Sequence, residues 1–145
     1  MLNPDYFWFE EQGHTMCIID DGEGNLFKGT AQCHEKDEKF KSERIGEYIA
    51  ESRALIKMYK YKLHNEAIPA YKALKHLKNS MEQSYRYNPK SFEARVMKKE
   101  YFYAKEVVEM YRIAIKNTRN ELARYLDKRK EYQEKNSWLF SRFMI

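Results

Sequence analysis

Residues 97–132 read MKKEYFYAKEVVEMYRIAIKNTRNELARYLDKRKEY, and this stretch decides the fold. Mostly apolar or tyrosine side chains recur in it at alternating steps of four and three residues. The positions are Met97, Tyr101, Ala104, Val108, Tyr111, Ile115, Thr118, Leu122, Tyr125, Arg129 and Tyr132. Five heptads with this spacing are typical of a helix that packs along one side against another helix. No Gly or Pro follows Pro89, so we predict one helix from about Pro89 to Lys135, about 70 Å long.

The segment before this helix, residues 42–87, has nearly the same length and a similar helical stripe. Its first part carries apolar or small residues at steps of four and three, and Asn65 and Pro69 then interrupt the pattern. Because Pro lacks an amide donor, we predict a break or kink there, with Asn65 as a new helix cap. Asn88 followed by Pro89 predicts the next helix start. The simplest arrangement is an antiparallel hairpin in which two helices pack on one long helix.

The first third of the chain predicts strands. The aromatic run Tyr6–Phe9 and the apolar run from His14 to Asp20 are β-prone, and Leu26 to Gln32 returns after a loop rich in Gly and Asp. The middle run is apolar at both parities, so we expect a central strand that is covered on two sides. The predicted fold class is therefore α+β, with a short antiparallel three-stranded meander in residues 1–40. Residues 41–145 form the helical hairpin, and we expect one cooperative domain.

Charge is divided unevenly between these two parts. Residues 1–38 contain two basic and nine acidic residues, whereas the remainder contains 25 basic and 13 acidic residues, so the net charges are −7 and +12. The basic part can attract an anionic ligand, and the acidic part can meet it within one chain or between subunits. Direct nucleic-acid binding is a lesser alternative, because acids are mixed among the basic residues.

Nothing in the sequence predicts an enzyme, a cofactor or a membrane protein. There is no phosphate-binding Gly loop, no paired nucleophile and base, no secretory signal and no apolar run long enough to span a bilayer. We therefore expect a cytoplasmic protein. Cys17 and Cys33, with His14 and His34 nearby, allow a zinc site, but ordinary packing of both thiols is the favoured interpretation.

Basic residues interleaved with Tyr and Asn give the one ligand-binding hypothesis. Arg112 and Arg119 follow Tyr111 on the predicted long helix, with Asn117 between them, and Arg53 lies on the first helix. Arginine binds phosphate through two parallel hydrogen bonds while an aromatic ring stacks on a base. The alternative is a solvated helix face with ion pairs between successive turns. For Arg53 the alternative is a salt link to acids of the meander.

Two further stretches carry a family resemblance. They are GTAQCHEKDEKF at 29–40 and IGEYIAESRA at 45–54, within a match over residues 6–54. A hairpin ending in Gly-x-Ala-x-Cys, an Asp-x-x-Phe turn and a helix opening Gly-x-x-x-Ala-x-x-Arg-Ala resemble small proteins of phages that infect Gram-positive bacteria. The best understood are Thoeris anti-defence sponges, which sequester cyclic ADP-ribose isomers. The resemblance implies a small antiparallel sheet with C-terminal helices, oligomers, and ligand sites between subunits that use Arg, Asn and an aromatic ring.

The expected function is thus that of a phage-encoded anti-defence protein in the host cytoplasm, which sequesters a cyclic nucleotide signal between subunits. The alternative is an inhibitor or adaptor, similar in role to an anti-CRISPR protein, that grips a host defence protein with its hairpin. We expect a homo-oligomer, most simply a dimer, because the seam, the sheet and the apolar tail from Trp138 onward exceed what a monomer can bury. We expect that tail to dock on the sheet or, preferably, on a neighbouring subunit.

Overall fold

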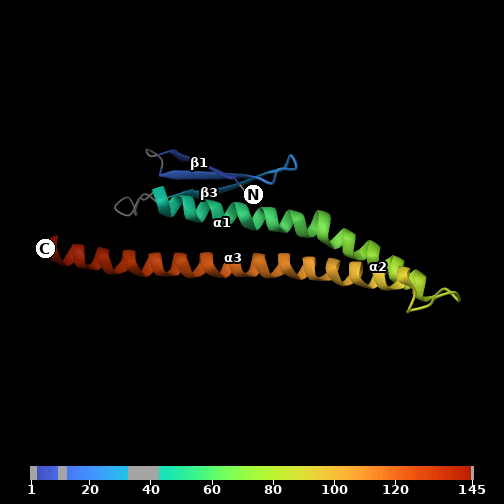
Figure 1. Ribbon diagram of the computed structural model, residues 1–145. Helices are drawn as coiled ribbons and strands as arrows, with labels where there is room; N and C mark the ends of the chain where they lie inside the picture. Colours follow the sequence, from blue (N-terminus) through green and yellow to red (C-terminus); the bar gives the residue numbers. More distant parts are fainter. Residues whose placement is uncertain (1–2, 10–12, 33–42, 145) are drawn as a thin grey trace. The chain divides into compact units, whose positions relative to one another are not determined.

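A computed structural model describes residues 3–9, 13–32 and 43–144, with side chains described as far as Lys130. The chain is α+β: a three-stranded antiparallel sheet is followed by two long helical segments that pack together (Figure 1). The predicted fold class is confirmed. The elements in chain order are β1 (Asn3–Phe9), β2 (His14–Asp20), β3 (Leu26–Gln32), α1 (Glu43–Lys62), the π-helical turn η3 (Leu63–Ala67), α2 (Ile68–Glu82) and α3 (Phe92–Met144).

The chain forms two compact units. The first comprises residues Met1–Met58 and Lys116–Ile145, so it holds the sheet, most of α1 and the second half of α3. The second, Tyr59–Ile115, holds the end of α1, η3, α2 and the first half of α3. We call them the sheet unit and the hairpin unit and describe each by itself.

The sheet is a meander with β2 in the middle. Acidic side chains build the turn between β2 and β3. Asp21 Oδ1 accepts hydrogen bonds from the amides of Glu23 at 2.8 Å and Asn25 at 3.1 Å, and Asp20 Oδ1 accepts one from Gly22 at 2.8 Å. Gly22 and Gly24 have φ values of 79° and 91°, which side-chain-bearing residues rarely adopt. The predicted hairpin is confirmed, and its carboxylates bind its own backbone.

One face of the sheet packs directly on α1. Thr15, Cys17 and Ile19 on β2 are completely buried. A Cβ atom on Gly29 would overlap the α1 backbone at Ala50, and one on Gly46 would overlap the Thr15 side chain. The backbone of β3 therefore approaches the backbone of α1 closely, because Gly29 has no side chain there. The expected cover on the second face of β2 is only partial, because Met16 and Ile18 on that face are half-buried.

The predicted interruption near Asn65 and Pro69 is present, but Asn65 as the cap of the next helix is wrong. The chain stays helical from α1 into α2 through η3, in which the amide of Ile68 donates to the carbonyl of Leu63. This wider turn precedes Pro69, which lies in the first turn of α2, where its missing amide costs little. The Asn65 side chain does not cap a helix; its Nδ2 donates to the carbonyl of Tyr61 at 3.1 Å.

The predicted start of the long helix at Asn88 is also wrong. Asn88 Oδ1 accepts a hydrogen bond from the amide of Lys90 at 3.0 Å and so stabilises a turn. The first residue of α3 is Phe92, and the hydroxyl of Ser91 accepts from the amide of Ala94 at 3.2 Å as its cap. The uninterrupted helix itself is confirmed.

The heptad seam of α3 is confirmed over its described side chains. All ten seam positions from Met97 to Arg129 are buried or half-buried. In the hairpin unit, Leu63, Ala67, Val108 and Ile115 form the buried core between the helices. Its tyrosines pair with one another, Tyr59 with Tyr111 and Tyr71 with Tyr101.

The sheet unit has a corresponding pair. Tyr48 of α1 and Tyr125 of α3 have ring centroids 4.4 Å apart. The seam tyrosines therefore supply internal ring contacts within each unit. The apolar tail that we expected to dock elsewhere lies outside the described side chains.

Candidate functional site

The predicted ligand residue Arg53 has a structural contact in the sheet unit. Its guanidinium Nη1 donates to the carbonyl oxygen of Thr30 at 2.7 Å. This bond ties α1 to β3 next to the close approach at Gly29. The expected alternative was a salt link to acids of the meander; this contact is with a backbone carbonyl.

The remaining predicted ligand residues are divided between the two units. Tyr111 and Arg112 belong to the hairpin unit, whereas Asn117 and Arg119 are exposed residues of the sheet unit. The Tyr111 ring packs 6.3 Å from that of Tyr59, and Arg112 Nη1 lies 3.0 Å from Glu109 Oε1 in an exposed ion pair. Neither unit by itself gathers these side chains into one cavity.

The hairpin unit instead has an apolar groove between α2 and α3. Its volume is about 320 Å³, and Ala67, Ala70 and Ala104 among its lining residues leave it open because their side chains are small. The full lining comprises Glu66, Ala67, Ala70, Leu74, Glu100, Tyr103, Ala104, Val107 and Tyr111. Tyr111 is thus the one predicted ligand residue that lines this groove.

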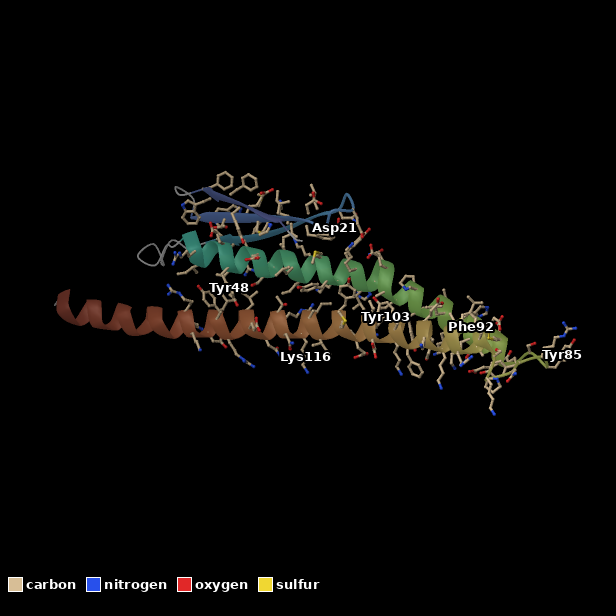
Figure 2. The ribbon with its side chains drawn as sticks, viewed as in Figure 1. Asp21, Tyr48, Tyr85, Phe92, Tyr103 and Lys116 are labelled. Atoms are coloured by element: carbon tan, nitrogen blue, oxygen red, sulfur yellow. The ribbon has the colours of Figure 1, made fainter. Side chains whose placement is uncertain are left out.

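Large apolar side chains continue the groove along both helices. Tyr103 is 70% exposed and is labelled on α3 in Figure 2. Met110, seven residues further on the same helix face, is 65% exposed, and Leu77, seven residues after Ala70 on α2, is 52% exposed. A run of such exposed side chains beside a cavity is characteristic of a protein-binding surface.

The ionisable groups that line the groove are acidic. Glu66 is held by the buried ammonium of Lys62, with Nζ and Oε1 3.2 Å apart. Glu100 is exposed at the other helix. A bound partner would meet an apolar floor with carboxylates at its edges, which favours cationic flanking residues.

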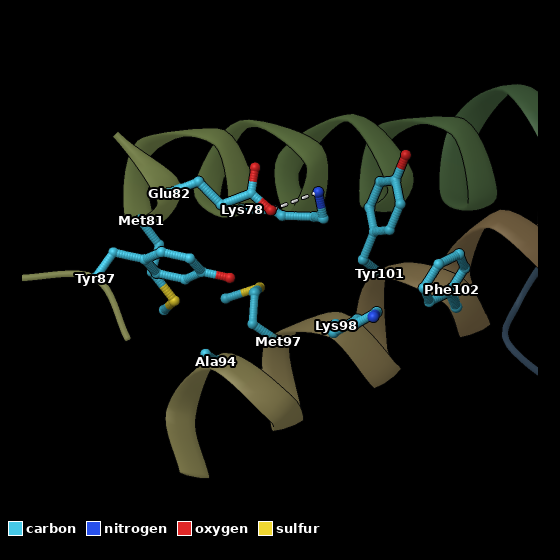
Figure 3. A pocket seen from close by; sticks show the side chains of 9 residues that line it. All are labelled: Lys78, Met81, Glu82, Tyr87, Ala94, Met97, Lys98, Tyr101 and Phe102. Carbon is cyan, nitrogen blue, oxygen red and sulfur yellow. Dashed lines mark ion pairs between the residues drawn. The ribbon is translucent and has the colours of Figure 1, made fainter. Parts of the chain in front are cut away.

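A second cavity of about 260 Å³ lies near the turn of the hairpin unit (Figure 3). Aromatic and methionine side chains form most of its wall, together with Lys78, Lys98 and Glu82. We call it the tip pocket, and its lining is Lys78, Met81, Glu82, Tyr87, Ala94, Met97, Lys98, Tyr101 and Phe102. It offers ring faces and ammonium groups to one ligand.

Hydrogen bonds and charge fix several groups of the tip pocket. Lys78 Nζ lies 2.8 Å from Glu82 Oε1 and 5.2 Å from the centroid of the Tyr101 ring. The hydrogen bond with Glu82 raises the pKa of Lys78. The hydroxyls of Tyr71 and Tyr101 are 3.3 Å apart, and this bond lowers the pKa of Tyr71 and raises that of Tyr101.

Metal and membrane chemistry find no support in the described part of the chain. Among residues 3–9, 13–32 and 43–144, no three His, Cys, Asp or Glu side chains gather as metal ligands would. Cys17 is a buried free thiol, and Cys33 and His34 lie outside the described residues. Within the same ranges, no helix is both long and apolar enough for a bilayer crossing.

Comparison with known proteins gives no relative. No protein-family model, curated protein or solved structure matches the chain. The function must therefore be argued from the groove and the tip pocket themselves.

Proposed function

We propose that this is a non-catalytic binding protein, an inhibitor or adaptor that holds an amphipathic helix of a partner protein in the groove between α2 and α3. The observation that carries the proposal is the groove itself, lined by alanines and bordered by exposed Leu77, Tyr103 and Met110. Two antiparallel helices with a shallow apolar channel between them accept a third helix, whose side chains enter at every third or fourth residue.

The partner helix has a definable chemistry. From Glu66 to Leu77 the groove side of the helical segment covers about 16 Å, or about three turns of a docked helix. Small side chains at Ala67, Ala70 and Ala104 admit Leu, Ile or Met of the partner. The carboxylates of Glu66 and Glu100 favour Lys or Arg beside that apolar stripe.

A substitution that fills the groove with a large side chain tests whether the partner binds there. Ala70 is exposed and lines the groove, so Ala70→Trp should block it without disturbing the core. Ala123 is an exposed alanine on α3 in the sheet unit, so Ala123→Trp adds the same bulk elsewhere. Binding of helical peptides with a Leu stripe and Lys flanks should weaken at least tenfold in the first variant and stay within twofold in the second.

A second helical peptide, with the same Leu stripe but Glu in place of the flanking Lys, tests the contribution of charge. It should bind at least tenfold more weakly than the Lys-flanked peptide, because like charges would meet at Glu66 and Glu100. A protein captured from bacterial lysate counts as the partner only if Ala70→Trp loses it and Ala123→Trp retains it. Equal binding by both tryptophan variants would contradict the proposal.

The tip pocket favours a second candidate function, sequestration of a nucleotide signal, the anti-defence role that the sequence resemblance implies. Tyr87, Tyr101 and Phe102 supply ring faces, and Lys98 supplies an ammonium group. Rings stack on bases and ammonium groups bind phosphate. The volume suits about one nucleoside unit, at the small end of ligand pockets.

Two adjacent lysines allow a matched test of nucleotide binding in the tip pocket. Lys98 lines the tip pocket, and Lys99 is an exposed neighbour that does not. Equilibrium dialysis against cyclic ADP-ribose isomers and cyclic oligonucleotides should show binding that Lys98→Glu removes and Lys99→Glu preserves. Heating should release the ligand unmodified. No binding across the panel would eliminate this second candidate and leave the groove untouched.

A further inference from the structure

The sheet has an outer face, opposite α1, that is apolar and partly exposed. The strand register places Phe7 beside Met16 and Asp5 beside Ile18 on β1 and β2. Along β2, Met16 and Ile18 alternate with Thr15, Cys17 and Ile19, which are buried against α1. Side chains alternate between the two faces of a strand, so Met16, Ile18 and their β1 neighbours Phe7 and Asp5 point away from α1. Phe7 is 45% exposed, Phe9 46% and Leu26 66%.

The inner face of the sheet is covered by α1, whereas the outer face has no such cover from α1. Gly29 and Gly46 bring α1 against the inner face, whereas Figure 1 shows the sheet unit with α1 on that one side of its strands. A three-stranded sheet with one covered face leaves the second face to solvent or to another molecule. Large aromatic and aliphatic side chains on a solvated face are unfavourable.

Two opposite charges lie at the edges of this outer face. The register joins Asp5 of β1 to Ile18 of β2, and Ile18 to Lys28 of β3, so the three residues form one row across the sheet. Both charged residues are exposed. Neighbouring strands are about 4.8 Å apart, so the two charges flank Ile18 on strands about 10 Å apart.

We propose that a second copy of this chain docks on the outer face, related by a two-fold axis parallel to β2. This rotation exchanges the two edges of the sheet, so β1 of one copy lies over β3 of the other. Asp5 then meets the partner's Lys28 and Lys28 meets the partner's Asp5. On the axis, Met16 and Ile18 pack on their own counterparts, and Asp20 lies on its counterpart at the strand end. Two sheets packed face to face in this way keep their strands nearly aligned, as sandwiches do.

The charges also select this axis over the alternative. A two-fold axis across the strands, through the same row, would place Asp5 on Asp5 and Lys28 on Lys28. Both contacts would be repulsive. Only the axis parallel to the strands turns the row into two attractive pairs around an apolar centre, as an isologous interface requires.

The expected dimer is weak. Strands of seven residues extend about 23 Å, and three strands span about 14 Å, so the contact is smaller than a standard stable interface. We expect a monomer–dimer equilibrium that shifts between about 10 µM and 1 mM. This association is independent of both the groove and the tip pocket, which belong to the hairpin unit.

Charge reversal and its rescue test the proposal. In sedimentation equilibrium of the full chain, Asp5→Lys and Lys28→Asp should each raise the dimer dissociation constant at least tenfold. The double variant Asp5→Lys/Lys28→Asp restores both pairs and should return to within threefold of the wild type. Lys116→Glu, an exposed reversal on α3 in the sheet unit, should have no effect beyond twofold. Ala70→Trp should also associate as the wild type does.

Three results would overturn the proposal. A wild-type chain that stays monomeric to 1 mM has no such interface. Single reversals that fold, by circular dichroism, and still associate normally would place the contact elsewhere. A folded double variant that remains as weak as the single variants would reject the axis parallel to β2. Ile18→Asp provides an independent check, since it should abolish the dimer whatever the edge charges are.

Discussion

At the residue scale, two glycines control how closely the sheet packs on α1. A Cβ on Gly29 would fall within the backbone of Ala50 and Ala54, and neither group can move without displacing a whole helix. At Gly46 the obstacle is the side chain of Thr15, which is completely buried. The role of Gly46 and Ala50 as a flat helix face is predictable from their spacing of four. The matching role of Gly29 is not, because it depends on which residue of β3 lies over the helix.

Gly29→Ala should therefore destabilise the fold by about 2–3 kcal/mol, the usual cost of overpacking. Gly22→Ala is the matched control: it also replaces a glycine, but no atom lies within 4 Å of the added Cβ. Its positive φ should cost only about 1 kcal/mol. Urea unfolding of both variants measures the difference. A Gly29→Ala protein as stable as Gly22→Ala would show that the close approach is not present.

Cys17 gives a prediction about alkaline pH. Burial, then the carboxylates of Glu51, Asp5 and Glu47, raise the pKa of its thiol from 9.0 to about 11. The unfolded chain releases this proton above pH 9 while the folded chain keeps it, so stability falls as pH rises from about 9 to 11. Urea unfolding at pH 8, 9 and 10 should show a steeper loss in the wild type than in Cys17→Ala. Equal slopes would mean that Cys17 titrates normally.

At the element scale, the seam of α3 predicts which side chains carry stability. Ile115 is 7% exposed in the core of the hairpin unit, and Ile113 on the same helix is 55% exposed. Ile115→Ala should cost about 2–4 kcal/mol and Ile113→Ala less than about 0.5 kcal/mol. Thermal or urea unfolding of the two variants measures both losses of stability. Similar losses from both would contradict the seam.

The sequence predicted the strands and the long helix well, because their signals are periodic and extend over many residues. Local signals were less reliable. Asn65 with Pro69 looks like a helix start, but one wider turn at Leu63–Ala67 keeps the chain helical around the missing amide. Asn88 with Pro89 likewise resembles a cap, yet Ser91 performs that role. Both errors arise because caps and turns use the same residue types.

The candidate site was harder to predict than the elements. Tyr111, Arg112, Asn117 and Arg119 are neighbours in sequence, but at 100° per residue a helix turns Tyr111 and Asn117 away from each other and away from the side that the two arginines share. Tyr111 faces the seam, where Tyr59 meets it. The groove depends on Ala70 and Ala104 being small next to exposed Tyr103, and alanines give no distinctive pattern in a helix. The heptad positions beside the seam, at Tyr103, Val107 and Met110, were the available signal.

At the scale of the whole molecule, three separate surfaces have separate chemistry. The groove is apolar with acidic edges, the tip pocket is aromatic with lysines, and the outer sheet face has an apolar centre with Asp5 and Lys28 on its two outer strands. The first two lie in the hairpin unit and the third in the sheet unit. A substitution in one surface should therefore leave the functions of the other two intact, so each proposal can be tested separately.

The central claim is that the partner binds in the groove, and methyl NMR of the methionines tests it most directly. Met110 lies on the groove side of α3 and is 65% exposed, whereas Met81 and Met97 line the tip pocket. Each methyl signal is assigned by a Met→Ile substitution, and the captured partner or the Lys-flanked helical peptide is then added to ¹³C-methyl-labelled protein. We predict that Met110 shifts and broadens while Met81 and Met97 stay unchanged. Saturating binding that leaves Met110 unmoved would contradict the account.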